Sequence, residues 1–301
     1  RCSAAKAFLT PVRSRRNLRI LTKTLVEKIT FEGRKANGVK FLKSGKEGFI
    51  TARKEIILSA GSIGSPQILM ISGIGKADEL KQHGIKVKLD LKGVGKNLQD
   101  HLQARPVFKV KVPTINTKTR GLFNQISIVL EYLIKRSGPM TLAASQGFGF
   151  LKSSSEISSP DIQFHIQPFS ADDPTITTHK FDAFTSSVLQ LRPQSRGEIL
   201  LKSSNIKDYP TIHPNYLSTE LDQKTLVEGI RMARYICRQP PVSNLIETEY
   251  APGPSLKDDD FSGLLDWVRQ TATTIYHPAG TCKMGQDIMA VVDETLKVRG
   301  I

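Results

Sequence analysis

Hydrophobic and polar positions alternate in short runs over the first sixty residues, and turn residues separate the runs. Extended strands are predicted for four runs, residues 18–21, 25–31, 39–42 and 55–58. Glu32-Gly33 and Ser44-Gly45 lie between runs at positions typical of tight turns. We therefore predict sheet strands and a hairpin in this region.

The last of these runs enters Ser59-Ala60-Gly61, after which the pattern becomes helical. Ser65-Pro66 supplies an N-cap residue and a first-turn proline for a helix that carries Ile68, Leu69 and Met70. The order is strand, glycine turn, helix. A second short helix is predicted over residues 77–83, with Gly84 as the residue that ends it.

Beyond Pro106 the chain changes to a mixture of strand-like and amphipathic segments. Apolar residues recur at helical spacing over residues 220–237 and 261–271, and an amphipathic run covers 123–134. Strands are predicted over 162–166, 185–191 and 198–201, and a polar, serine-rich loop over 152–160. We expect this part to be largely antiparallel sheet with helices.

Length and composition exclude several classes of protein. A chain of 301 residues with 39 % apolar content can bury a sizeable core, which excludes intrinsic disorder. No apolar run approaches the roughly 18 residues of a membrane span, so no transmembrane segment is predicted. The three cysteines, Cys2, Cys237 and Cys282, are widely spaced and predict neither a disulfide framework nor a zinc site.

The net charge of +15 is concentrated in one part of the chain. Residues 1–120 contain 26 Lys and Arg against 8 Asp and Glu, whereas residues 121–301 contain 17 against 20. Binding of nucleic acid would need stacking aromatics among the basic residues, and only Phe8 lies near the arginines at 13–19. A solvated basic face is therefore favoured, and no nucleic-acid partner is predicted.

The two ends suggest a longer parent protein. The chain begins with Arg1 rather than Met, lacks the apolar core of a signal peptide, and stops at Ile301 directly after a turn-like Arg-Gly. We expect truncation at both ends, so that any localisation signal lies outside these residues and secretion stays open.

Two glycine-containing turns are candidates for binding. The segment 61–66 opens a helix, so its backbone N–H groups could face an anion such as a pyrophosphate; a tight turn that needs small residues for packing explains it equally well. Segment 93–98 lacks the third glycine of a dinucleotide fingerprint. We expect its turn instead to bring Asn97, Asp100 and His101 close to a functional site.

One histidine stands out as a candidate catalytic residue. His277 opens a loop with a proline and two glycines, and an imidazole can accept a proton from a substrate hydroxyl near neutral pH. A structural role is the alternative. The other histidines fit structural positions: His83 at a helix end, His165 in a strand, and His179 and His213 in polar loops. Since no pair has metal-ligand spacing, no metal site is predicted.

Taken in order, these segments resemble the glucose-methanol-choline (GMC) oxidoreductases. The resemblance extends from residue 17 to 301 and is carried by four segments, 61–75, 93–101, 214–217 and 277–285. Insect glucose-dehydrogenase-like members look most similar. The resemblance implies an α/β FAD-binding domain, here incomplete, and an α+β substrate domain built on an antiparallel sheet. Residues 1–104 and 271–301 would contribute to the first, and 105–270 would form the second.

The same resemblance implies the function and the site. The parent would be an FAD-dependent oxidoreductase that acts on CH–OH groups of alcohols or sugars and passes electrons to oxygen or a quinone. His277 would take the hydroxyl proton while hydride passes to the flavin. Cofactor contacts are implied for Val26, Ser59, Ala60, Gly61 and Asn97.

The family's Gly-x-Gly-x-x-Gly unit and its second catalytic His or Asn have no counterpart within these residues. We therefore expect the 301 residues alone to bind FAD poorly and to be inactive. Two alternatives remain: a GMC-fold lyase or non-catalytic remnant, and a basic module that binds polyanions.

Overall fold

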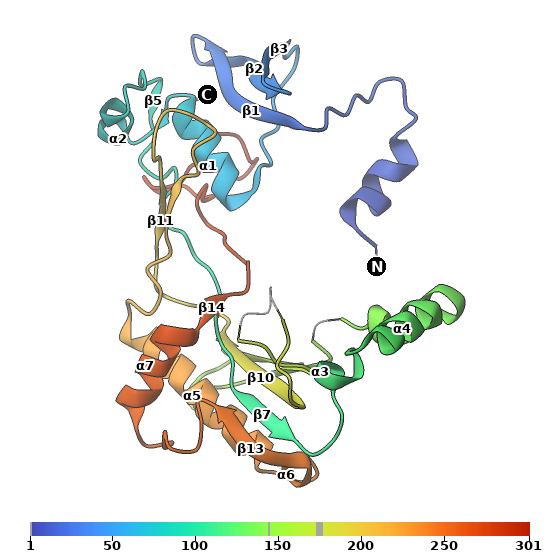
Figure 1. Cartoon of the computed structure of the whole chain (residues 1–301). Coiled ribbons are helices and arrows are strands. Elements are labelled where there is room, and N and C mark those ends of the chain that lie inside the picture. Colours follow the sequence, from blue (N-terminus) through green and yellow to red (C-terminus); the bar gives the residue numbers. More distant parts are fainter. Residues whose placement is uncertain (1, 144, 173–176) are drawn as a thin grey trace. The chain divides into compact units, whose positions relative to one another are not determined.

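The computed structural model describes residues 2–143, 145–172 and 177–301, which form two compact units (Figure 1). The first unit contains the chain up to Lys96 together with Ile199–Ile212 and Thr281–Ile301. The second contains Asn97–Glu198 and His213–Gly280. The chain therefore passes from one unit to the other four times.

These units differ from the predicted division at three places. Residues 97–104 and 271–280 belong to the second unit, and 199–212 belong to the first. The physical reason for the last is hydrogen bonding, because the Ile199 N–H donates to the Gly95 carbonyl at 2.6 Å and the Gln67 amide donates to the Asp208 carbonyl at 2.9 Å. The cofactor and substrate roles of the parts stay predictions.

A three-stranded antiparallel meander opens the first unit. Its strands are β1 (Thr24–Glu32), β2 (Lys35–Lys43) and β3 (Lys46–Thr51), in that order. The strands predicted at 25–31 and 39–42 are confirmed. β3 was not predicted, because its apolar residues Phe49 and Ile50 are adjacent, both about half exposed, and show no alternation.

Two predicted strands of the first unit are wrong. Residues 18–21 and 55–58 have no regular structure, and Ile57 is 80 % exposed. A strand requires a neighbour that completes its backbone hydrogen bonds, and no described strand pairs with either segment. Apolar composition alone was therefore not enough to predict a strand in either segment.

Helix α1 (Gly61–Ile71) forms the buried centre of the first unit. Its Leu69 and Met70 are each 2 % exposed. The helix begins at Gly61, four residues before the predicted N-cap Ser65, so Pro66 lies inside it. The short helix α2 (Ala77–Gln82) is confirmed, with Gly84 at a φ of +69° after its end. Between and after them β4 (Ile74–Gly75) and β5 (Leu89–Asp90) form a parallel pair.

The second unit is built on a seven-stranded antiparallel sheet. Five strands follow the order β13-β7-β10-β6-β14, while β9 pairs with β10 and β8 with β9. Their bounds are β6 (Leu102–Ala104), β7 (Val107–Val110), β8 (Gly147–Leu151), β9 (Ile162–Gln167), β10 (Ala183–Gln190), β13 (Ile246–Ala251) and β14 (Thr273–Thr274). The strands predicted at 162–166 and 185–191 are confirmed. The one at 198–201 is β11 (Glu198–Leu200), which pairs separately with β12 (Thr211–His213).

Two predicted helices pack on this sheet and close the core of the second unit. α5 (Glu220–Cys237) and α7 (Phe261–Thr271) bury Val227, Ile230, Leu264 and Val268, each 0 % exposed, together with Val188 of β10. Side chains cap both helices: the Asp222 N–H donates to Thr219, and the Gly263 N–H donates to Asp260. The spacing of apolar residues was sufficient to predict both helices, because each helix buries one face.

Helix α4 (Leu122–Lys135) contrasts with α5 and α7. The amphipathic run predicted there is helical, yet none of its fourteen residues is buried, and Phe123 is 88 % exposed. Shorter helical segments complete the fold: η1 (Ala5–Leu9), η2 (Thr10–Val12), α3 (Ile115–Lys118), η3 (Pro139–Thr141) and α6 (Val242–Leu245). Among the described residues, no helix combines the length and apolar character needed to cross a bilayer.

Candidate active site

The loop that contains His277 is fixed alongside residues 97–101 of the second unit. Gln99 and Ala279 exchange two backbone hydrogen bonds, at 2.9 and 2.8 Å. Gly280 has a φ of +94°, and a Cβ there would overlap the Asn97 carbonyl, so only glycine allows this close approach. The sequence predicted both segments as important, and the structure shows that they lie side by side.

Within this arrangement two histidine rings face each other. His101 Nδ1 lies 3.3 Å from His277 Nδ1, and the ring centroids are 5.5 Å apart at 65°. The other nitrogen of His101, Nε2, lies 3.1 Å from the Leu191 carbonyl oxygen. A carbonyl can only accept a hydrogen bond, so His101 Nε2 carries a proton and donates it there.

This contact determines the tautomer of His277. With both rings neutral, His101 Nδ1 has a lone pair and accepts the hydrogen bond, so His277 Nδ1 carries the proton. His277 Nε2 is then left with a lone pair. That atom is the one that can take a proton from a ligand, as a general base must.

Asp100 holds the two histidines in position. Its Oδ1 accepts the backbone N–H groups of His101 and His277 at 2.9 and 3.0 Å. Its Oδ2 accepts the hydroxyls of Tyr216 and Thr274, both at 2.5 Å. Burial and the bond to Asp100 raise the pKa of Tyr216, which keeps its hydroxyl protonated as a donor. Four donors thus fix one carboxylate at the base of the loop.

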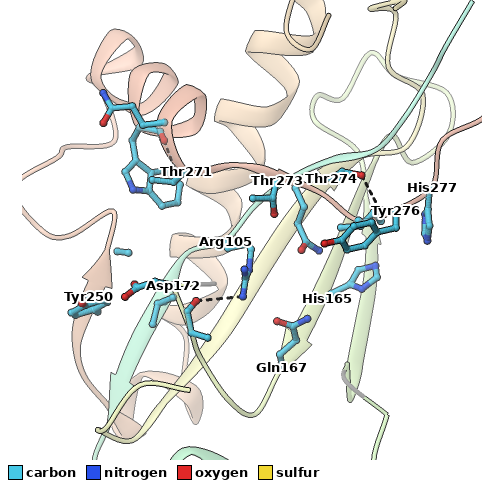
Figure 2. A pocket seen from close by; sticks show the side chains of 17 residues that line it. Arg105, His165, Gln167, Asp172, Tyr250, Thr271, Thr273, Thr274, Tyr276 and His277 are labelled. Carbon is cyan, nitrogen blue, oxygen red and sulfur yellow. Dashed lines mark hydrogen bonds between the residues drawn. The ribbon is translucent and has the colours of Figure 1, made fainter. Parts of the chain in front are cut away.

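A cavity of about 840 Å³ adjoins this site within the second unit. Figure 2 shows His277 and Tyr276 at one side, with His165 and Gln167 projecting from β9. Arg105, Asp172 and Tyr250 lie farther along the lining. The volume is within the range of small-molecule sites, about 300–1,000 Å³.

His165 is a residue that sequence reasoning had assigned a structural role. It lines the cavity, and burial, with smaller contributions from His277 and His101, lowers its pKa, so the ring is neutral at pH 7. The alternation along β9 was the available signal: Ile162 and Phe164 are buried, whereas Gln163, His165 and Gln167 occupy the other face.

The first unit contains four of the residues implied to contact a cofactor. Val26 lies in β1 beside a bulge, where Val26 pairs with Phe41 and Lys28 with Lys40, which leaves Glu27 without a β2 partner. β1 is the edge of its sheet, so one side of its backbone has no described strand partner. A main chain of this kind has N–H and C=O groups to offer to a ligand.

Ser59, Ala60 and Gly61 are exposed at the start of α1. Gly61 has a φ of +78°, and no described atom lies within 4 Å of where its Cβ would be. The Ala60 N–H donates to Ser65 Oγ at 3.0 Å, which holds the turn in shape. An open turn of small residues at a helix N-terminus allows an anionic group to approach backbone N–H groups.

Pro66 has a specific consequence inside α1. A proline has no N–H, so it cannot donate to the carbonyl of Ser62 four residues earlier. The Thr281 hydroxyl donates to that carbonyl instead, at 2.5 Å. Thr281 belongs to the predicted catalytic loop, and this bond ties the far end of the loop to α1 within the first unit.

Asn97 lies in the second unit and has both ends of its amide engaged. Nδ2 donates to the Gly280 carbonyl at 3.2 Å, and Oδ1 accepts from Arg196 Nε at 3.2 Å. The structure thus shows Asn97 as a support of the His277 loop, and its contact with a cofactor stays a prediction.

Two features lie near the end of the chain. Cys282 is a half-buried thiol whose pKa burial raises to about 11, which fits a packed rather than a nucleophilic cysteine. Residues 291–293 form no extended strand. Val292 makes only isolated bridges to Met284 and Val298, because the chain turns back at Asp293, whose carbonyl accepts the Leu296 N–H.

The match to a known family agrees with this fold and site. Family models described as GMC oxidoreductase match residues 1–103 and 193–301. The chain belongs to the GMC oxidoreductase family. The resemblance found in the sequence is confirmed at this level, as is the predicted fold class.

Two curated relatives and one solved structure illustrate the similarity. The chain is 41 % identical to an alcohol dehydrogenase [acceptor] of Pseudomonas putida, over all of this chain and 55 % of that protein. It is 40 % identical to the mitochondrial choline dehydrogenase of Homo sapiens, over all of this chain and 51 % of that protein. A formate oxidase variant of Aspergillus oryzae matches 96 % of this chain and 56 % of its own, with a TM-score of 0.87 and 28 % identity. The chain thus spans about half the length of the curated relatives it matches.

Proposed function

We propose that the protein containing this chain oxidises the CH–OH group of an alcohol with FAD as its cofactor. The observation that carries this proposal is the His101–His277 pair, which leaves His277 Nε2 with a lone pair beside a cavity of about 840 Å³. The Pseudomonas relative is an alcohol dehydrogenase, and FAD is named for the Aspergillus formate oxidase.

The residues of the first unit fit such a cofactor through their main chain. The bulged edge strand at Val26 and the open turn at Ser59, Ala60 and Gly61 offer backbone groups without obstructing side chains. Bound FAD would supply the acceptor for hydride from the carbinol carbon. Asn97 is also proposed as a cofactor contact.

The chain's own residues would manage the proton. His277 Nε2 accepts the hydroxyl proton of the substrate, while its Nδ1–H stays hydrogen-bonded to His101. His101 is itself held by the Leu191 carbonyl, and Asp100 fixes both backbones, so no reorientation is needed during proton transfer. Narrower features also belong to the proposal: an alcohol or sugar as substrate, oxygen or a quinone as acceptor, and a placement near insect glucose dehydrogenases.

The test is anaerobic reduction of the flavin in the whole protein by a panel of alcohols. His277→Ala should lower kcat by roughly 10²–10⁴-fold while flavin stays bound, because only the proton acceptor is lost. His213→Ala is the matched control, since His213 is exposed at the end of β12 and has no part in this pair. Unchanged turnover in His277→Ala would contradict the assignment.

A further inference from the structure

Two polar atoms in the cavity wall have no partner among the residues that the structure describes. His165 Nε2 and Gln167 Oε1 are both buried and make no hydrogen bond there. Buried polar atoms in proteins are nearly always hydrogen-bonded, so each exception needs an explanation. Both residues line the cavity that contains His277.

Their positions on β9 place the two atoms on one face. His165 and Gln167 are two residues apart, and alternate residues of a strand point to the same side (Figure 2). The backbone of Gln167 pairs with Thr185 of β10, which fixes where its side chain starts. His165 Nδ1 lies 3.2 Å from Ser145 Oγ, so that ring already uses one nitrogen.

The chemistry of the Gln167 atom specifies the missing partner. An amide oxygen accepts hydrogen bonds and donates none, so its partner must carry an O–H or N–H. His165 beside it is neutral, because burial lowers its pKa, so this face of β9 adds no positive charge. An uncharged hydroxyl of a ligand satisfies these conditions.

We propose that Gln167 is a specificity-determining residue: its Oε1 accepts a hydrogen bond from a second hydroxyl of the alcohol substrate. The cavity then selects alcohols that carry a second donor group over monohydric alcohols of the same length. This inference rests on the proposed oxidation of alcohols. A cavity of about 840 Å³ has room for a substrate with both groups.

The size of the preference for diols over monohydric alcohols follows from the cost of leaving Gln167 Oε1 without a hydrogen bond. A monohydric alcohol that fills the cavity brings no second donor and leaves Gln167 Oε1 without a hydrogen bond. Leaving a buried acceptor unsatisfied lowers affinity by roughly 10-fold to 100-fold. The diol does not suffer this loss of affinity, because its second hydroxyl supplies the missing donor.

The experiment compares α,ω-diols of three to six carbons with the 1-alkanols of the same lengths in the whole flavoprotein. We measure kcat/KM by flavin reduction and, separately, Kd by titration calorimetry. For the wild type we expect one diol length to exceed its alkanol by roughly 10-fold to 100-fold in both quantities. The length at which this occurs reports the separation between the reacting carbon and Gln167.

Three variants identify the residue responsible. Gln167→Leu should lower the diol-to-alkanol ratio to about one, since the acceptor is lost, with the change in KM rather than in kcat. Gln167→Glu retains an acceptor oxygen and should keep a preference for the diol. Gln163→Leu is the matched control, because Gln163 lies on the same strand but does not line the cavity; its ratio should equal that of the wild type.

Each other outcome has a defined meaning. Equal constants for diols and alkanols in the wild type would show that Gln167 Oε1 binds water only, and would overturn the inference. A ratio that persists in Gln167→Leu would overturn it as well. If no alcohol reduces the flavin, the proposed function fails, while the ratio of Kd values still decides whether Gln167 selects a second hydroxyl.

Discussion

The two units offer their functional groups in different ways. In the first unit the candidate cofactor contacts are main-chain groups, at a bulged edge strand and at the open turn before α1. In the second unit the functional groups are side chains: one carboxylate holds His101 and His277, and His277 lines a cavity. Each main-chain feature of the first unit comes from residues that are close together in the sequence. The side-chain site of the second unit instead unites residues up to 177 positions apart.

This difference decides how each unit responds to mutation. A main-chain site tolerates most side-chain changes and depends on the few glycines that set its conformation. A site of side chains depends on the framework that orients them. In the second unit that framework includes a buried ion network on α5 as well as the apolar core.

The largest expected effect is on this ion network. Arg234 is 2 % exposed and pairs with Glu249 and Asp258, each at 2.8 Å. Arg234→Met removes the buried cation, leaves Glu249 without its partner and leaves Asp258 with Arg238 alone, which should cost about 3–5 kcal/mol of stability. Denaturant unfolding at pH 7 measures the loss, and Arg269→Met, at an exposed pair, is the control with about 0–1 kcal/mol.

Acid should reduce the difference in the free energy of unfolding between the wild type and Arg234→Met. Burial raises the pKa of Asp258, but bonds from Arg238 and Arg234 outweigh it and hold that pKa below its usual value. A lowered folded-state pKa gives stability that is present above the unfolded value, about 4, and is lost as pH falls through the folded value. A difference that stayed constant from pH 7 to pH 3 would contradict this account.

Sequence patterns predicted the two units unequally. Helices α5 and α7 were predictable because one face of each is buried, and the turn at Gly61 because a glycine directly precedes a helical pattern. The strand predicted at 55–58 failed because pairing is not encoded in one segment. His165 was missed for the same reason: its closeness to His277 arises only when the strands of the sheet assemble.

A smaller effect is expected at His101, which acts through His277. His101→Phe keeps a ring but removes the acceptor for His277 Nδ1–H and the donor to the Leu191 carbonyl. His277 is then free to rotate and to change tautomer, so kcat should fall by about 10–100-fold. KM should change little, because His101 does not line the cavity.

A conservative variant distinguishes this positioning role from general damage. His101→Gln can still accept a hydrogen bond from His277 Nδ1, so it should restore part of the kcat that His101→Phe loses. Equal kcat values in the two variants would argue for a structural role only.

The smallest effect is expected for alanine at Gly61, compared with alanine at Gly84. The comparison distinguishes a turn that binds a cofactor through its main chain from a turn that only reverses the chain. Gly61 and Gly84 both have positive φ, +78° and +69°, and no described atom lies within 4 Å of a Cβ added at either. An alanine should therefore cost about the same at each, roughly 1–2 kcal/mol of stability in the first unit, from backbone strain alone. If the turn before α1 contacts FAD, Gly61→Ala should in addition lower the flavin content of the whole protein, while Gly84→Ala should not.

The ratio of flavin absorbance to protein absorbance after gel filtration, compared at equal thermal stability, measures the flavin content. Equal flavin content in the two variants would mean that the turn only packs, and the first unit would then need another main-chain segment to bind its cofactor.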